Sequence, residues 1–142
     1  MISKWAPAKV NLFLQVLGKR PDGYHELATL MQKIGLSDRI LFEAGGRGIQ
    51  IECPGSPLPA DETNIAYKAA AVLFNHINDY PGIRITIEKR IPAAAGLGGG
   101  SSDAATVLKG LNELFGYNLN REELISLGEK IGADVPFFLV DG

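Results

Sequence analysis

The chain has 142 residues, of which 46% are hydrophobic and 21% are charged, and it carries a formal net charge of -2. This size and balance predict one globular domain with a sizeable core and exclude a disordered chain. The slight negative charge gives no general attraction for the phosphates of DNA or RNA or for an anionic membrane, so we expect neither as a partner.

The first residues, MISKWAPAKVNLFLQV, predict neither a signal peptide nor a membrane span, because Pro7 and Lys9 interrupt them and apolar residues alternate from Val10 onward. Cys53 is the only cysteine, which excludes an intramolecular disulfide and a cysteine-rich metal site. Both features favour a soluble protein in the cytoplasm.

The first half of the chain carries strand signals. Apolar residues alternate over 10–16, and a second apolar run covers 27–34 after the turn RPDGYH. Residues 38–43 and 49–53 predict a hairpin that is joined through the glycines of the segment AGGRG. We therefore expect a sheet that is built mainly from this half.

The second half predicts helices around one clear strand. Asn64 precedes an apolar stripe of helical spacing that reaches Ile77, residues 83–88 alternate as a strand, and another helical stripe covers 104–115. The pair Asn120 and Glu123 then predicts a capping box at the start of a last helix. That helix is expected to end shortly before the apolar run VPFFLV.

Between the strand and the second helix lies PAAAGLGGGSS, residues 92–102, in which four of the five positions from Gly96 to Gly100 are glycine. Glycine loses more freedom on folding than any other residue, so this density requires a reason. A helix start offers unpaired N–H groups and a positive dipole end to an anion, and glycines let a phosphate approach them. Ser101 and Ser102 add hydroxyls for phosphate or for Mg²⁺, for which Ser102 is the candidate ligand. The segment predicts a cradle for nucleotide phosphates.

Two familiar phosphate-binding motifs do not fit this segment. The Walker motif needs Lys and then Ser or Thr directly after its last glycine, where this chain has Ser101 and Ser102. A dinucleotide fingerprint counted from Gly96 needs its third glycine at Ser101, and the β-rich first half lacks the βαβ unit that opens such a fold. The alternative without a ligand is a tight connection, for which about two or three glycines would suffice.

Together with its flanking segments, the loop resembles the GHMP kinases, the small-molecule kinases that include galactokinase, homoserine kinase and mevalonate kinase. The resemblance is carried by PAKVNLFLQV at 7–16, IPAAAGLGGGSSDAA at 91–105 and GADVPFFL at 132–139. RPDGYHEL at 20–27 adds a resemblance to the branch of the family that acts on 4-diphosphocytidyl-2-C-methyl-D-erythritol in the non-mevalonate isoprenoid pathway. The order of the four segments makes the resemblance specific.

The resemblance implies an α+β fold, a layered β-rich N-terminal domain with a left-handed βαβ crossover, against the general right-handed rule. It implies phosphorylation of the 2-hydroxyl of that small-molecule substrate by ATP with Mg²⁺. Family members are about twice this length, with two domains. Residues 1–142 are therefore expected to be the ATP-binding and catalytic domain of a truncated chain that lacks the C-terminal domain, with little turnover of its own. The VPFFLV end is then expected to expose an apolar surface that promotes self-association.

The resemblance also implies roles for individual residues, by motif position. Lys9 and Asp134 are the catalytic pair, in which Lys9 holds Asp134 ionised and Asp134 accepts the proton of the attacking hydroxyl. Tyr24 and His25 contact the cytosine end of the substrate, and Asn11 lies on the substrate side. The residues implied to bind ATP are Pro92, Ala93, Ala94, Ala95, Gly96, Leu97, Gly98, Gly99, Gly100, Ser101, Ser102 and, on the adenosine side, Asn64.

Each of these residues also has an ordinary structural interpretation. Asp134 can be a turn or capping residue, Lys9 a solvated charge at a strand end, and Asn64 a helix cap. Tyr24 and His25 can form a hairpin corner, although a ring there could stack on a base and an imidazole could hydrogen-bond its polar edge.

Two further functions stay open. The first is another GHMP kinase that acts on homoserine, mevalonate or a sugar, and the RPDGYHEL segment argues against it. The second is a non-catalytic domain of the same fold that binds nucleotide or RNA. The presence of both Lys9 and Asp134 and the negative net charge argue against that function.

Overall fold

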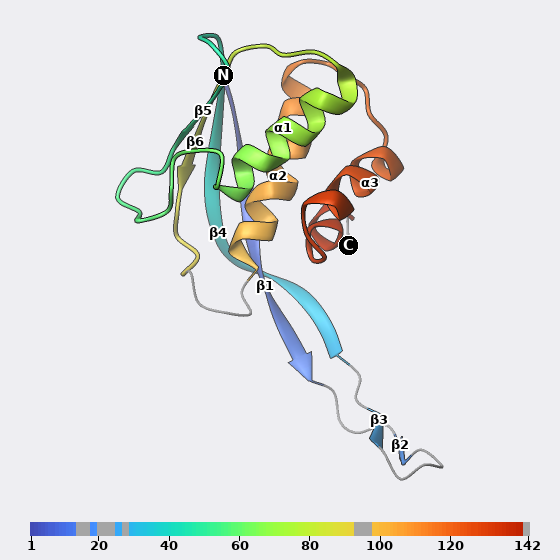
Figure 1. Ribbon diagram of the computed structural model, residues 1–142. Coiled ribbons are helices and arrows are strands. Elements are labelled where there is room, and N and C mark those ends of the chain that lie inside the picture. The colour runs from blue at the N-terminus through green and yellow to red at the C-terminus, as the bar shows by residue number, and fades with distance from the viewer. Residues whose placement is uncertain (14–17, 20–24, 27–28, 93–97, 141–142) are drawn as a thin grey trace.

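A computed structural model of the protein describes residues 1–13, 18–19, 25–26, 29–92 and 98–140 (Figure 1). Its strands and helices follow the chain in the order β1 (Ile2–Phe13), β2 (Gly18–Lys19), β3 (His25–Glu26), β4 (Thr29–Ala44), β5 (Ile49–Glu52), α1 (Ile65–Ile77), β6 (Ile83–Glu88), α2 (Gly99–Leu114), α3 (Arg121–Ile131) and the short 3-10 helix η1 (Val135–Leu139). The mixed sheet with its helices confirms the predicted α+β class.

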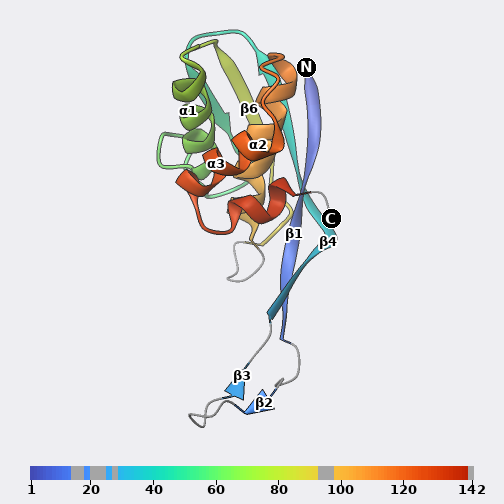
Figure 2. The same ribbon diagram turned by 90° about the vertical axis from the view of Figure 1, so that its right-hand side faces the viewer.

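The main sheet has the strand order β1-β4-β6-β5. β4 pairs antiparallel with both β1 and β6, whereas β5 runs parallel to β6. Helices α1 and α2 cover one face of this sheet, and α3 packs against them (Figures 1 and 2). The parallel pair needs a crossover connection, and α1 supplies it.

The predicted hairpin of residues 38–43 and 49–53 is wrong, because β6 lies between these two segments. The turn glycines have positive φ angles, as a tight turn requires, but Gly45 donates a hydrogen bond to the carbonyl of Gly82, 2.8 Å away, at the approach to β6. The apolar side chains of β6 are almost fully buried, as expected of a strand with a neighbour on each side. The chain therefore leaves β4, passes the start of β6 and pairs on its far side.

The two longest strands extend the sheet beyond the helices (Figure 2). β4 runs without a break from Thr29 to Ala44 and so joins the two predicted segments, and β1 begins at Ile2 rather than at residue 10. Their register shifts between Pro7 and Lys9, so that Lys9 lies opposite Lys33. Proline has no N–H for the ladder, and the irregularity falls next to it. Lys9 is thus placed just after a break in regular pairing.

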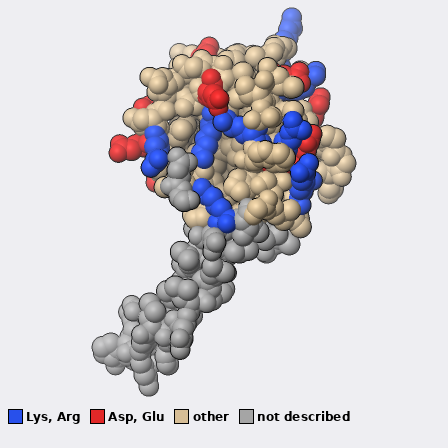
Figure 3. Space-filling view, turned by 180° about the vertical axis from the view of Figure 1, so that it is seen from behind, with Lys and Arg blue, Asp and Glu red and all other residues tan. Residues whose placement is uncertain are grey.

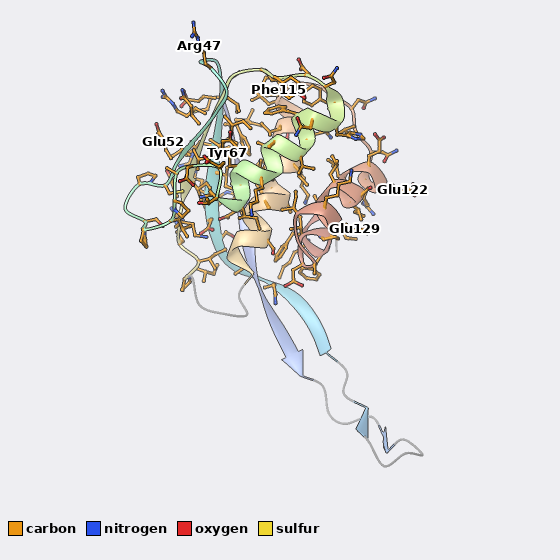
Figure 4. The ribbon with its side chains drawn as sticks, in the orientation of Figure 1. Arg47, Glu52, Tyr67, Phe115, Glu122 and Glu129 are labelled. Atoms are coloured by element: carbon orange, nitrogen blue, oxygen red, sulfur yellow. The ribbon has the colours of Figure 1, made fainter. Side chains whose placement is uncertain are left out.

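The core lies between the sheet and the helices α1 and α2. Helix α2 approaches the sheet closely at Gly110, where an added Cβ would lie 2.3 Å from the ring of Phe42. Phe115, just after α2, packs edge to face against Phe74 of α1 with ring centroids 6.1 Å apart (Figure 4). The largest fully buried side chains are those of Ile40, Phe42, Leu73, Phe74, Ile83, Ile85, Ile87, Val107, Leu108, Leu111, Leu127 and Val135.

Part of the C-terminal apolar run, which the sequence predicts to be exposed, packs within the domain. Val135, Phe138 and Leu139 are buried, and η1 packs against α2 and α3. Of the large hydrophobic side chains of this run only Val140 is exposed, and its carbonyl accepts a hydrogen bond from the Lys33 ammonium at 2.8 Å. These contacts lie within one chain and do not test association between chains, so the self-association through this run stays a prediction. In the described part of the chain, no helix has the length and apolarity to cross a membrane.

Candidate active site

Helix α2 begins inside the glycine-rich segment rather than after it. Gly98 is the N-cap residue, with a left-handed backbone at φ 69° and ψ 21°, and none of the described side chains caps the helix. The first intrahelical bond runs from the amide of Ser102 to the carbonyl of Gly98, at 2.8 Å. The preceding amides, from Gly99 to Ser101, have no partner of their own within the helix. They form an uncapped start with the positive end of the helix dipole behind it.

A cavity of about 400 Å³ opens beside this helix start. Its volume lies in the range of small-molecule sites, roughly 300–1,000 Å³, and it combines apolar walls with backbone amides and one ammonium group. The residues that line it are Leu58, Pro59, Thr63, Asn64, Ile65, Lys89, Pro92, Gly98, Gly99, Gly100, Ser101 and Asp103.

The side chains of Lys9 and Asp134 come together from the two ends of the chain. The Lys9 side chain is only 3% exposed, and its Nζ lies 3.9 Å from Oδ2 of Asp134, whose side chain is 49% exposed. Asp134 stands at the start of η1 but makes no capping hydrogen bond there. A carboxylate that is open to solvent on one side and held beside a buried ammonium on the other can accept a proton from a bound hydroxyl.

Gly98 connects this ion pair to the cavity. An added Cβ at Gly98 would lie 2.9 Å from Cγ of Lys9 and 3.1 Å from Cζ of Phe138, so the Lys9 stem packs directly against the helix start. Gly98 also lines the cavity, whereas Lys9 and Asp134 do not. The cavity and the ion pair therefore meet at the N-cap of α2.

A second charged cluster was not predicted from the sequence. The Lys89 ammonium lies 2.6 Å from Oδ2 of Asp38 and 3.0 Å from Oδ2 of Asp103, and both carboxylates are buried. Asp103 lies inside the segment 91–105, but no motif connects it with Asp38 and Lys89, because the three residues meet only when β6 inserts beside β4. One signal was available: Asp103 falls on the same helical face as Val107 and Leu111, where an apolar residue would be expected.

Burial and neighbouring charges separate the pKa values of the two carboxyl groups. Burial, reinforced by a hydrogen bond to Asp38, raises the pKa of Asp103 to about 8, against the effect of Lys89. Burial would also raise the pKa of Asp38, but hydrogen bonds from Asp103, the Ile91 amide and Lys89 lower it overall. Near neutral pH the proton therefore resides on Asp103 and the negative charge on Asp38.

The protonation of Asp103 makes the folded state less stable as the pH rises. Its folded pKa of about 8 lies above the ordinary value of 3.8, so between these values the folded chain holds a proton that the unfolded chain has released. Stability is expected to fall across this window by up to about 1.4 kcal/mol per pH unit. Asp103→Asn, which keeps the size and polarity of the neutral acid, should flatten this dependence in urea melts at about pH 5 and about pH 8. An equal slope in both chains would contradict the assignment.

The other predicted residues are placed as follows. Asn64 is the N-cap of α1, where its Oδ1 accepts a hydrogen bond from the Ala66 amide at 2.8 Å, so the capping interpretation is confirmed. Asn64 also lines the cavity, and its role on the adenosine side stays a prediction. Ser102 is fully buried and does not line the cavity, and its hydroxyl has no hydrogen-bond partner in the described part of the chain. Among the described residues, no group of three or more His, Cys, Asp or Glu side chains could hold a metal ion.

Several predicted residues cannot be placed in this site. Asn11 and His25 belong to β1 and β3, but their side chains lie outside what the structure describes. The residues wholly outside the described ranges are Tyr24, Ala93, Ala94, Ala95, Gly96 and Leu97.

Known proteins resemble this chain in both sequence and fold. Residues 64–142 match the model of the GHMP kinases N terminal domain. The chain is 52% identical over its whole length to the 4-diphosphocytidyl-2-C-methyl-D-erythritol kinase of Syntrophus aciditrophicus, covering 51% of that protein. It is 55% identical over 98% of its length to the kinase of the same name from Syntrophotalea carbinolica, covering 50% of it.

A solved structure of a kinase of the same kind resembles the chain in fold. The crystal structure of a 4-(cytidine 5'-diphospho)-2C-methyl-D-erythritol kinase matches with a TM-score of 0.76 and 45% identity, over 97% of this chain and 48% of that one. The chain spans about half the length of the curated relatives that it matches.

Proposed function

The chain belongs to the GHMP kinase family, and from that premise we propose that it is the N-terminal domain of a kinase that transfers the γ-phosphate of ATP to the 2-hydroxyl of 4-diphosphocytidyl-2-C-methyl-D-erythritol. Its place would be the non-mevalonate route to isoprenoid precursors, in the cytoplasm. The observation that carries the proposal is the meeting of three parts at Gly98: an uncapped helix start, a nucleotide-sized cavity and the pair of Lys9 and Asp134.

The uncapped start of α2 suits the phosphates of ATP. Phosphate oxygens can accept hydrogen bonds from the amides of Gly99 to Ser101, and the helix dipole favours their negative charge. The Lys89 ammonium faces the same cavity and adds positive charge. The apolar walls around Leu58 and Ile65 suit the adenosine end.

The pair of Lys9 and Asp134 suits the transfer step. Oxygen of the acceptor hydroxyl bonds to the γ-phosphorus, the bond from that phosphorus to the oxygen bridging to the β-phosphate breaks, and ADP leaves. Asp134 takes the proton of the hydroxyl through its carboxylate. Lys9, 3.9 Å from Oδ2 of Asp134, favours the ionised form of the base and adds positive charge beside the phosphate.

Mg²⁺ would neutralise phosphate charge during the transfer. The Ser102 hydroxyl fits as a ligand in one respect, because it has no hydrogen-bond partner among the described residues. It also lies in the first turn of α2, next to the amides that are proposed to bind the phosphates. It is also fully buried, so the nucleotide phosphates and water would supply most ligands.

The open face of the sheet gives no support to the alternative of RNA binding. Basic side chains are spread over the rear of the molecule with acidic ones among them (Figure 3). Arg39 pairs with Glu88 at 3.9 Å, and Arg84 pairs with Glu52 at 3.6 Å. A surface of mixed sign lacks the basic stripe that a nucleic acid requires.

The proposal is tested by measuring ADP release from the protein in its full natural length. We expect turnover with 4-diphosphocytidyl-2-C-methyl-D-erythritol and none above background with homoserine, mevalonate or galactose. Turnover with homoserine, mevalonate or galactose, and none with the cytidyl substrate, would instead support the alternative of another GHMP kinase.

The cytidine contacts can be tested in the same assay. Replacing Tyr24 or His25 with Ala is expected to raise the KM for the cytidyl substrate about tenfold, because base stacking contributes roughly 1–3 kcal/mol. The KM for ATP should stay within about twofold, since these residues belong to another part of the chain. An unchanged KM for the cytidyl substrate would contradict their role.

A further inference from the structure

The cluster of Asp38, Lys89 and Asp103, called here the buried clamp, lies between the end of β6 and the first turns of α2. The Lys89 ammonium contacts one oxygen of each carboxylate, at 2.6 Å and 3.0 Å. Asp38 is fully buried, Asp103 is 2% exposed and the Lys89 side chain is 13% exposed. The three side chains come from β4, from the residue after β6 and from α2.

The clamp fixes the direction of the chain where it leaves β6. Oδ1 of Asp38 accepts hydrogen bonds from two successive amides, those of Arg90 at 2.6 Å and Ile91 at 2.8 Å. Its other oxygen holds Lys89, which in turn holds Asp103 in α2. β4, the end of β6 and the start of α2 are thus tied to one another through one carboxylate and one ammonium.

The clamp also touches the helix start itself. An added Cβ at Gly99 would lie 3.2 Å from Nζ of Lys89 and 3.1 Å from Cγ2 of Ile91. Lys89 and Asp103 both line the cavity beside it. A shift of Lys89 would therefore change the position of the first amides of α2 and the shape of the cavity together.

Stability alone does not explain this arrangement. Apolar residues of similar volume can often replace a buried ion pair without loss of stability. Among the described residues, Oδ1 of Asp103 moreover has no hydrogen-bond partner although it is buried, an exception that calls for an explanation. The location of the clamp directly beside the cavity indicates a role in ligand binding.

We propose that Asp38, Lys89 and Asp103 are positioning residues for the nucleotide, which hold the start of α2 and the Lys89 ammonium in the arrangement that the phosphates of ATP require. The inference rests on the function proposed above. It assigns the affinity for ATP, rather than for the acceptor alcohol, to this cluster, because Lys89 and Asp103 line the cavity whereas Lys9 and Asp134 do not.

The test compares Lys89→Met with Lys4→Met in the protein in its full natural length. Each change removes an ion-paired lysine. Lys89 pairs with both Asp38 and Asp103 beside the cavity, whereas Lys4 pairs with Glu113 at the surface, away from the cavity. Lys89→Met is expected to weaken ATP binding in calorimetry, and to raise the KM for ATP, about tenfold or more. The KM for the acceptor alcohol should change less than about twofold, and Lys4→Met should leave all three values unchanged.

Two further variants keep the test decisive. If thermal melts show that Lys89→Met does not fold, Asp38→Asn takes its place, because it keeps an acceptor for the two amides and removes only the charge that holds Lys89. Lys89→Arg, which retains the charge, should recover part of the affinity for ATP. If the folded variants bind ATP as the wild type does, or if the KM values for both substrates rise equally, the positioning role of the clamp is overturned and the proposed function is not. A wild-type protein that binds no ATP would overturn the proposed function and the clamp with it.

Discussion

Asp134→Asn is expected to lower kcat about a thousandfold, because an amide of the same size cannot accept the proton of the attacking hydroxyl. The carboxylate is half-exposed and lies 3.9 Å from the Lys9 ammonium, so the substitution removes a charge from a solvent-facing position without opening the core. The KM for ATP should change little, since Asp134 does not line the cavity. Steady-state kinetics with both substrates varied separates these effects.

The matched control is Glu129→Gln, the same loss of charge at an exposed position on α3 (Figure 4). It is expected to leave kcat within about twofold of the wild type. A fall in kcat of less than about tenfold in Asp134→Asn would mean that another group, or water, accepts the proton.

Gly98→Ala is expected to reduce kcat/KM about a hundredfold and to lower the free energy of unfolding by about 1–3 kcal/mol. The added methyl group would lie in a left-handed backbone and 2.9 Å from Cγ of Lys9. Lys9 must then move, which shifts its ammonium away from Asp134 and disturbs the helix start at the same time. Urea melts and kinetics on one preparation measure both effects.

Gly116→Ala provides the control for backbone strain. Gly116 has a similar φ of 64°, but an added Cβ there meets nothing within 4 Å, and it lies beyond the other end of α2. The stability loss should be comparable or smaller, and the kinetics should not change. If Gly98→Ala affected kinetics no more than Gly116→Ala, close packing of Lys9 on the helix start would not matter for activity.

Local signals predicted the helices well, because the responsible contacts lie close in sequence. The capping box of α3 is present, with the Glu123 amide donating to Oδ1 of Asn120 at 2.8 Å. Asn64 caps α1 in the same way. The exception is α2, whose first turn is made of Gly99 to Ser102; glycine has low helix propensity, and only tertiary packing makes it helical.

The strand order could not be predicted from local patterns. β5 and β4 look like a hairpin because glycines separate them, yet β6, which comes after a whole helix, inserts between them. The strand order depends on which strand is apolar enough to lie in the interior of the sheet. In β6, Ile83, Ile85 and Ile87 are almost fully buried, so this strand takes the position between β4 and β5. Alternation of apolar and polar residues in the sequence predicts such a strand, but it does not predict which strands pair with it.

In the candidate site, too, the features that depend on local sequence could be predicted, and those that depend on strand pairing could not. Spacing alone indicated an anion site at the start of α2, whereas Lys9 and Asp134 were nominated by the family resemblance. The cluster of Asp38, Lys89 and Asp103 was missed because its members meet only through the pairing of β4 with β6. Charged residues that fall on the apolar face of a predicted helix, as Asp103 does, are the one local sign of such a cluster.

The most direct test is a crystal structure of the protein in its full natural length with a non-hydrolysable ATP analogue. The account predicts that oxygens of the terminal phosphates accept hydrogen bonds from the amides of Gly99 to Ser101, with the γ-phosphorus on the side of Gly98 that faces Lys9 and Asp134. Phosphates bound anywhere else, or a γ-phosphate separated from Asp134 by the body of α2, would contradict it.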